Sequence, residues 1–250
     1  MHTKGKPVDS DVNLDVLARR TPGFTGADLS NLVNEAALLS ARRNKKTISI
    51  NSLEESIERV IAGPERKSKV ISDREKRLTA YHEGGHALIG LLLPNADPVH
   101  KVTIIPRGRA GGYTLMLPKE DRSYATRGEL LDRLKTMLGG RVAEEVVLKE
   151  ISTGASNDIQ QASGLVRSMI TQYGMSERFG LMGLAETQNQ YLDGRAVMNC
   201  GDSTATEIDH EVMKLLKYSY DEAKRLLSEN REALDKIAEF LIERETITGK

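Results

Sequence analysis

The sequence predicts a mainly helical protein with two units: an all-helical one at residues 1–63 and a larger, mostly helical one at residues 64–250 with a small β-hairpin. Three observations favour this fold class. Apolar residues recur at helical spacing over most of the chain, whereas only two short runs have the composition of strands. The dipeptide Gly63-Pro64 ends the last helix of the first unit, and a charge-rich connector follows it. A chain of 250 residues is also long enough for two domains.

Three helices are predicted in the first unit. Residues 11–20 have amphipathic spacing. The tetrapeptide Thr25–Asp28 is a capping box, which predicts a helix from there to about Arg43. A second box at Ser52–Glu55 is expected to begin the third helix, which runs to about Ile61.

The second unit begins with a predicted helix at residues 73–93, which Pro94 ends. Two strand-like runs follow at residues 99–106 and 112–118, and a Gly-containing turn separates them, as in a β-hairpin. Each run ends in Pro, which predicts edge strands because Pro cannot donate to a sheet ladder. The remaining predicted elements are a helix from Thr126 to about Leu148 that Gly139–Gly140 can interrupt, a helix at 158–172, a polar loop at 186–203, and one long or two consecutive helices at 204–245.

The composition is that of a soluble globular protein and excludes several function classes. Lys plus Arg equals Asp plus Glu at 36 each, so no global positive field attracts nucleic acid, and no nucleic-acid partner is expected. The longest strongly apolar stretch, residues 87–93, is far too short to cross a bilayer. The opening residues contain no apolar segment of the kind found in signal peptides. Because Cys200 is the one cysteine, no intrachain disulfide can form.

The pentapeptide His82-Glu83-Gly84-Gly85-His86 is the strongest functional signal. Residues i and i+4 of a helix lie on one face, so His82 and His86 can bind the same metal ion. Two imidazoles at this spacing suit Zn²⁺, and the Glu of this motif acts as general base in metalloproteases. The sequence therefore predicts a zinc site with Glu83 as the catalytic base.

The adjacent Gly84 and Gly85 lie inside the predicted helix. Each should cost about 1 kcal/mol of helix stability relative to Ala. Such a violation of a local rule often marks a functional site. The two glycines are expected to let another backbone, or a substrate, come close to the metal.

A third protein ligand must come from elsewhere in the chain. Ile89 and Leu92 stand where the extended zincin motif requires Gly and His, so that class is excluded. The remaining candidates are Asp158, at the start of a predicted helix, and the neighbouring acids Glu144 and Glu145. Spacing alone does not choose between Asp158 and Glu145. The isolated residues His100 and His210 are more typical of surface or core histidines.

A series of motifs covering nearly the whole chain resembles the FtsH-type ATP-dependent zinc metalloproteases. YHEGGHAL, VTIIPRG, GGYTLMLPKED, LGGRVAEE, STGASNDIQQAS and YGMSERFG occur in the order of that family's protease domain, and RTPGFTGADLSNLVNEAAL resembles the helical lid of its AAA+ module. The resemblance implies an AAA+ lid at residues 1–63 and a zincin-type protease domain at residues 64–250. One departure is Gly84, where the family usually has Ala.

The resemblance also implies roles for individual residues. Asp158 matches the Asp that completes the zinc site with His82 and His86, one Zn²⁺ per chain, and the residues near the nucleotide in related AAA+ modules match His2, Gly26 and Ala27. Separately, the second strand-like run offers a docking edge, at which an extended substrate can pair with the backbone of Gly112, Tyr113, Thr114 and Leu115.

The implied activity is that of a zinc metalloendopeptidase that degrades unfolded, misfolded or short-lived membrane and cytosolic proteins. For the full-length enzyme, the resemblance implies a homo-hexamer anchored at the cytoplasmic face of the cell membrane that uses ATP and Mg²⁺. No P-loop occurs here, so the chain is expected to be a soluble piece, lid plus protease domain, without the ATPase core. Two other function classes stay open on the residues alone: a helical adaptor with an incidental His pair, and a zinc hydrolase such as a deacetylase.

Overall fold

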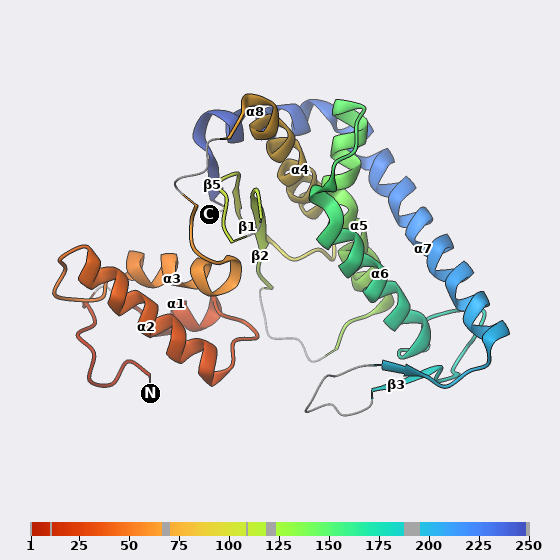
Figure 1. The fold of residues 1–250 in the computed structure, drawn as a ribbon, viewed down its shortest axis with the longest axis horizontal. Helices are drawn as coiled ribbons and strands as arrows, with labels where there is room; N and C mark the ends of the chain where they lie inside the picture. The colour runs from red at the N-terminus through yellow and green to blue at the C-terminus, as the bar shows by residue number, and fades with distance from the viewer. Residues whose placement is uncertain are drawn as a thin grey trace.

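The structure is a computed structural model that describes residues 2–10, 12–66, 71–108, 110–118, 124–187 and 196–248. Its elements are mostly helices with a few short antiparallel strands, which confirms the predicted fold class. The N-terminal helices lie beside the β-hairpin, and the long helices of the C-terminal unit pack on the hairpin's other side (Figure 1). Within the described residues, no helix has the length and apolar character that crossing a membrane requires.

The N-terminal unit contains α1 (Leu14–Arg19), α2 (Gly26–Arg42) and α3 (Ile50–Ala62). The capping box at Thr25 is present, with Thr25 N donating to Asp28 Oδ2 at 2.8 Å. The second predicted box is wrong, because α3 begins at Ile50 with Ser49 as the preceding residue. Ser52 instead lies within the helix, buried against α2, where its hydroxyl accepts a hydrogen bond from Ser40 at 3.1 Å.

The C-terminal unit is built around α4 (Asp73–Leu92), the helix of the His82 motif. Its elements after α4 are β1 (Val99–Thr103), β2 (Tyr113–Met116), α5 (Arg127–Ala143), a π-helical segment (Glu144–Leu148), a 3₁₀ turn (Thr153–Ala155), α6 (Ser156–Thr171), β3 (Ala185–Thr187), β4 (Ala196–Met198), α7 (Asp202–Glu229), α8 (Arg231–Arg244) and β5 (Thr246–Thr248). The predicted helical region at 204–245 is thus two helices.

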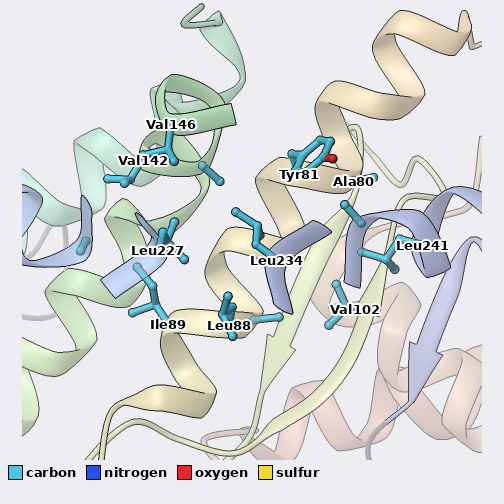
Figure 2. Close-up of a cluster of buried hydrophobic side chains, with 14 of the residues drawn as sticks. Ala80, Tyr81, Leu88, Ile89, Val102, Val142, Val146, Leu227, Leu234 and Leu241 are labelled. Carbon is cyan, nitrogen blue, oxygen red and sulfur yellow. The ribbon is translucent and has the colours of Figure 1, made fainter. Parts of the chain in front are cut away.

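The core of the C-terminal unit forms around α4. From Ala80 to Gly90 every residue of this helix is buried, as expected for a helix covered on all sides. Helices α5, α7 and α8 and strand β1 supply the surrounding apolar side chains, and Leu234 of α8 lies in the middle of this cluster (Figure 2). The motif helix is therefore held rigidly inside the domain.

Two of the helix glycines let α4 and α5 meet backbone to backbone. A Cβ atom added to Gly85 would lie 2.4 Å from the carbonyl oxygen of Gly139, and one added to Gly139 would lie 2.8 Å from that of Gly85. A contact this close excludes any side chain. The possible break at Gly139–Gly140 is not seen, since α5 continues to Ala143 before it widens into the π-helical segment.

The small sheet has the strand order β2-β1-β5, with both pairs antiparallel. The prediction that both hairpin strands are edges is wrong for β1, because the C-terminal strand β5, which the sequence did not indicate, pairs with it. Pro98 and Pro106 do not prevent this pairing, since they lie outside Val99–Thr103. The predicted polar loop at 186–203 overlaps a second hairpin, β3 with β4, and residues 188–195 lie outside the described part.

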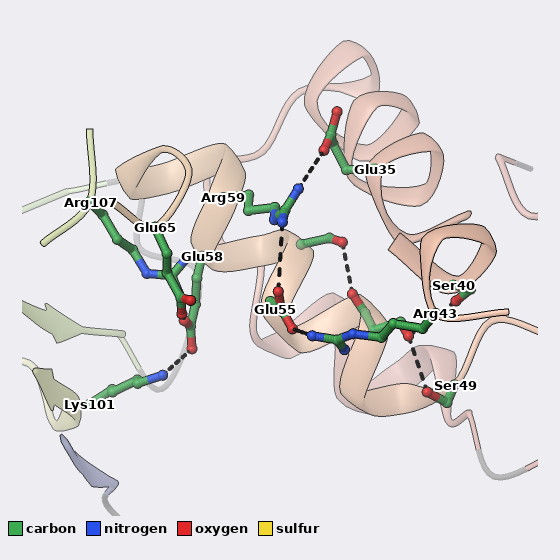
Figure 3. A network of polar contacts seen from close by, with 12 residues as sticks. Glu35, Ser40, Arg43, Ser49, Glu55, Glu58, Arg59, Glu65, Lys101 and Arg107 are labelled. Carbon is green, nitrogen blue, oxygen red and sulfur yellow. Dashed lines mark hydrogen bonds and ion pairs between the residues drawn. The ribbon is translucent and has the colours of Figure 1, made fainter. Parts of the chain in front are cut away.

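A cluster of ion pairs connects the two units (Figure 3). Glu58 of α3 accepts from Lys101 of β1 at 2.5 Å and from Arg107, just beyond β1, at 2.8 Å. Arg107 is buried and also pairs with Glu65 at 2.6 Å. Removing one partner of a buried ion pair leaves an uncompensated charge, so this cluster fixes where the N-terminal unit meets the hairpin.

The close contact between α4 and α5 gives a stability prediction. Replacing Gly85 by Ala should lower the free energy of unfolding by about 1–3 kcal/mol, because the methyl group has no space against Gly139. Gly84→Ala is the matched control: its Cβ would meet Ile237 and Leu234 at an ordinary 3.4 Å, and Ala gains up to about 1 kcal/mol of helix propensity. Urea unfolding of both variants measures the difference. Equal destabilisation would contradict the asymmetry between the two glycines.

Candidate metal centre

Three side chains from two helices converge on one point. His82 and His86 lie one turn apart on α4, and their Nε2 atoms are 3.1 Å apart. Asp158 lies in the first turn of α6, where its Oδ2 is 3.3 Å from Nε2 of His82 and 3.6 Å from Nε2 of His86. Among the described residues, this trio is the group of His, Cys, Asp or Glu side chains whose geometry suits a metal ion.

The hydrogen bonds on the far side of each imidazole determine which nitrogen is free. Nδ1 of His82 lies 2.7 Å from Oε1 of Glu144, and Nδ1 of His86 lies 2.7 Å from the carbonyl oxygen of Thr136. A carbonyl oxygen and an ionised carboxylate only accept, so both Nδ1 atoms carry the proton and donate. In the neutral rings both Nε2 atoms therefore present lone pairs to each other and to Asp158, an arrangement that requires a cation or a proton between them.

The distances fit a tetrahedral metal ion. Ligand atoms about 2.0–2.1 Å from such an ion are about 3.3 Å from one another. The three separations here, 3.1, 3.3 and 3.6 Å, bracket this value. Two imidazole nitrogens and one carboxylate oxygen also leave a fourth position open, as in catalytic rather than structural sites.

Gly140 of α5 leaves the space for an ion. A Cβ atom at this position would lie 2.5 Å from Nε2 of both His82 and His86. Any side chain here would occupy the point on which the ligand atoms converge. The glycine pair at residues 139–140 thus has two separate roles, since Gly139 contacts the α4 backbone and Gly140 opens the site.

The electrostatics of the trio show the same need for positive charge. Burial disfavours the protonated form of His82, but its hydrogen bonds with Asp158 and Glu144 outweigh burial and raise its pKa to about 10. Burial also acts to raise the pKa of Asp158, yet the hydrogen bonds with His82 and His86 lower it well below its ordinary range. The carboxylates thus favour a cationic centre, and a divalent ion can replace the proton.

Glu83 lies beside the trio and is not a member of it. Its side chain is buried, and burial raises its pKa, an effect that the nearby His86 and His82 partly oppose. The hydroxyl of Thr114 on β2 donates to Glu83 Oε2 at 2.8 Å. The motif thus places the buried carboxylate of Glu83 next to the candidate metal site, where this carboxylate is not one of the three ligands.

Comparisons with known proteins agree with this geometry. Residues 69–250 match the model of peptidase family M41, and residues 11–55 match that of the AAA+ lid domain. The chain belongs to peptidase family M41. Several curated relatives carry the name "ATP-dependent zinc metalloprotease FtsH", with sequence identities to the whole chain of 56% in Rubrobacter xylanophilus, 54% in Kosmotoga olearia and 52% in Bacillus subtilis. The chain spans 39%, 39% and 40% of the length of these three relatives.

The rival ligands in this M41 chain lie elsewhere. Glu144, in the π-helical segment, contacts the opposite nitrogen of His82 and also accepts from the backbone N–H of Ser152 at 2.7 Å. Glu145 is directed toward α7, where it accepts from Tyr220 and from Lys224. His100 lies on β1 beside α3, and His210 is exposed on α7. None of these four is in the trio.

The other predicted site residues fall into two groups. His2 and Gly26 are neighbours, since a Cβ at Gly26 would lie 3.8 Å from His2 Nε2, and Ala27 follows Gly26 in the first turn of α2. Gly112 comes just before β2, and Tyr113, Thr114 and Leu115 are in it. In this sheet β2 pairs with β1 alone, so its other edge is open within the described residues.

Sequence reasoning missed three contributors to the site. The carbonyl of Thr136 and the space at Gly140 cannot be inferred from residue type, because they depend on how α5 packs against α4. Glu144 was weighed as a ligand but lies on the outer side of His82. The pair Gly84–Gly85 was expected to let another backbone come close, which Gly85 does against Gly139, and the pair Gly139–Gly140 was the matching signal on α5.

The third ligand gives a prediction that separates Asp158 from Glu145. Asp158→Ala should lower the affinity for a divalent metal at least about tenfold. Removing a residue that only hydrogen-bonds a metal ligand already lowers metal affinity by about 10–100-fold, and removing a ligand itself should lower it no less. Glu145→Ala should keep the metal, since its carboxylate bonds Tyr220 and Lys224. Metal per chain after dialysis, measured by mass spectrometry, tests this. The reverse pattern would contradict the assignment.

Proposed function

We propose that the chain is the proteolytic part of an ATP-dependent zinc metalloprotease, in which His82, His86 and Asp158 hold one Zn²⁺. The observation that carries this proposal is the convergence of three acceptor atoms at tetrahedral spacing around the space left by Gly140. Membership of peptidase family M41 supports peptide bonds as the substrate, and the names of the relatives, which are zinc metalloproteases, support zinc.

When bound, the zinc ion would supply Lewis acidity and lower the pKa of a water molecule toward neutrality. The protein's own contribution begins at Glu83, whose carboxylate accepts a proton from the attacking water. Glu83 then donates this proton to the nitrogen of the departing amine. Burial raises the pKa of Glu83, which suits a group that must both accept and release a proton near neutral pH.

The open edge of β2 is the proposed substrate-docking site. The N–H of Leu117 donates to the carbonyl of Pro98 at 3.1 Å, on the side of β1. Backbone groups alternate in direction along an antiparallel strand, so those of Thr114 and Met116 face the open edge. An extended peptide can pair there through its own backbone, which gives broad tolerance of substrate sequence. Of the four residues predicted for docking, Thr114 thus offers its N–H and C=O, Tyr113 and Leu115 direct theirs to β1, and Gly112 precedes the strand.

Further parts of the proposal concern the longer protein. We infer a boundary near residues 63–64, between an AAA+ lid and the protease domain, with His2, Gly26 and Ala27 near the nucleotide of an intact ATPase module. The match of residues 11–55 to the AAA+ lid domain supports this inference. The intact enzyme is proposed to be a hexamer at the cytoplasmic face of the membrane that uses ATP and Mg²⁺ to unfold membrane and cytosolic substrates.

Replacing the proposed base tests the mechanism. Glu83→Gln should reduce cleavage of unfolded casein by about 10²–10⁴-fold while zinc stays bound, because Glu83 moves a proton and is not a ligand. The control is Glu150→Gln, an exposed carboxylate paired with Arg74, which should cleave at the wild-type rate. Initial rates and zinc per chain are measured together.

Two outcomes would contradict this proposal. A Glu83→Gln protein that still cleaves casein at near the wild-type rate would exclude the proton-transfer role. Loss of zinc from that variant would show that Glu83 is a ligand, which would require a different site geometry.

A further inference from the structure

The hydroxyl of Thr114 connects the edge strand to the proposed base. Its Oγ1 is 2.8 Å from Glu83 Oε2 and 3.1 Å from the backbone oxygen of Glu83. A hydroxyl has one proton, and the shorter contact to a charged acceptor is the stronger one. Within the described residues, this is the one side-chain hydrogen bond to the Glu83 carboxylate. No side chain of the described residues is hydrogen-bonded to the other carboxylate oxygen, Oε1.

We propose that Thr114 is a positioning residue for proteolysis: its hydroxyl holds Oε2 of Glu83, so that Oε1 stays aimed at the attacking water. This inference rests on the proposed function, in which Glu83 is the base. The role belongs to the side chain of Thr114 and is separate from docking, which uses the backbone of the same residue.

Glu83 needs such a partner because no other side chain of the described residues hydrogen-bonds its carboxylate. A Glu side chain loses substantial rotamer freedom when it is fixed, and a misplacement of about 1 Å in a reacting group can cost about 10²-fold in rate. Gly112 is close to the stem of Glu83, since a Cβ there would lie 3.0 Å from Glu83 Cγ. The strand therefore passes next to the side chain but offers no packing group at that point, and the bond from Thr114 supplies the orientation.

The position of Thr114 in the sheet fits this role. Thr114 is opposite Val102 of β1, a buried core residue, so its side chain lies on the sheet face that packs against α4. Its N–H and C=O face the open edge. A substrate strand paired at this edge would thus contact the backbone of the residue whose side chain holds the base.

The test compares three substitutions at this position. Thr114→Val removes the hydroxyl, keeps the shape and suits a strand, whereas Thr114→Ser keeps the hydroxyl. We expect Val to lower kcat on a flexible peptide about 10–100-fold with KM within about twofold, and Ser to stay within about threefold of wild type. Zinc per chain should equal wild type in both. Should the Val protein fail to fold, Thr114→Ala against Thr114→Ser gives the same comparison.

Two controls show where the effect arises. Thr246→Val removes a hydroxyl from the far edge of the same sheet, where Thr246 bonds Thr103 at 2.8 Å, and should leave kcat unchanged. Adding Thr114→Val to the Glu83→Gln variant should cause no further loss of kcat. If Thr114 acts only by orienting the Glu83 carboxylate, its hydroxyl has no effect once that carboxylate is gone.

The outcomes distinguish this inference from the proposed function. Wild-type kcat in Thr114→Val, equal losses in Val and Ser, or a rise in KM alone would each overturn the positioning role. A further loss of the same size in the double variant would show that Thr114 acts independently of Glu83. The proposed function fails on a different result, namely casein cleavage by Glu83→Gln alone.

Discussion

The convergence of three acceptor atoms, Nε2 of His82, Nε2 of His86 and Oδ2 of Asp158, is the constraint on which the rest of this domain depends. Their lone pairs repel one another unless a positive charge lies between them. The fold holds them together nonetheless, because Glu144 and the Thr136 carbonyl fix both imidazoles from behind. A chain that maintains such an arrangement inside its core is organised for a cation.

The packing of the domain follows from this constraint. The two histidines need a helix that cannot move, and α4 is buried from Ala80 to Gly90 by three helices and β1. Gly85 and Gly139 bring α5 close enough for its Thr136 carbonyl to meet His86, and Gly140 then leaves the ion its space. The π-helical segment that follows α5 carries Glu144 to His82, in keeping with the frequent occurrence of such segments at functional sites.

The β1–β2 hairpin contacts both the proposed catalytic site and the N-terminal unit. On one face, β2 contacts Glu83 through Thr114. Toward the N-terminal unit, Lys101 and the buried Arg107 pair with Glu58 of α3. One small sheet thus contacts both the proposed base and the predicted lid. A shift of α3 would have to separate Glu58 from the buried Arg107 and the partly buried Lys101, or move the hairpin with it.

Local patterns predicted the helices and the histidine pair well, because amphipathic spacing, capping boxes and the i, i+4 rule act over a few residues. Features that depend on distant partners were not predictable in this way. Strand β5, Thr246–Thr248, consists of β-branched residues but is too short to be predicted without its partner β1, and the start of α3 after Ser49 was missed because Ser52–Glu55 also matches a capping box. Spacing also left Asp158 and Glu145 unresolved, since the choice depends on tertiary packing: the first turn of α6 brings Asp158 to the two histidines, whereas Glu145 is directed toward α7. The resemblance to known proteases favoured Asp158 for that role.

Anomalous diffraction at the zinc absorption edge, on crystals of the protein, is the direct test for a zinc ion among His82, His86 and Asp158. We expect one peak per chain, bonded to both Nε2 atoms and to a carboxylate oxygen of Asp158 at about 2.0–2.2 Å. The absence of a peak from protein purified without chelators and supplied with zinc would contradict it. A peak bonded to Glu145 or Glu144 in place of Asp158 would contradict it equally.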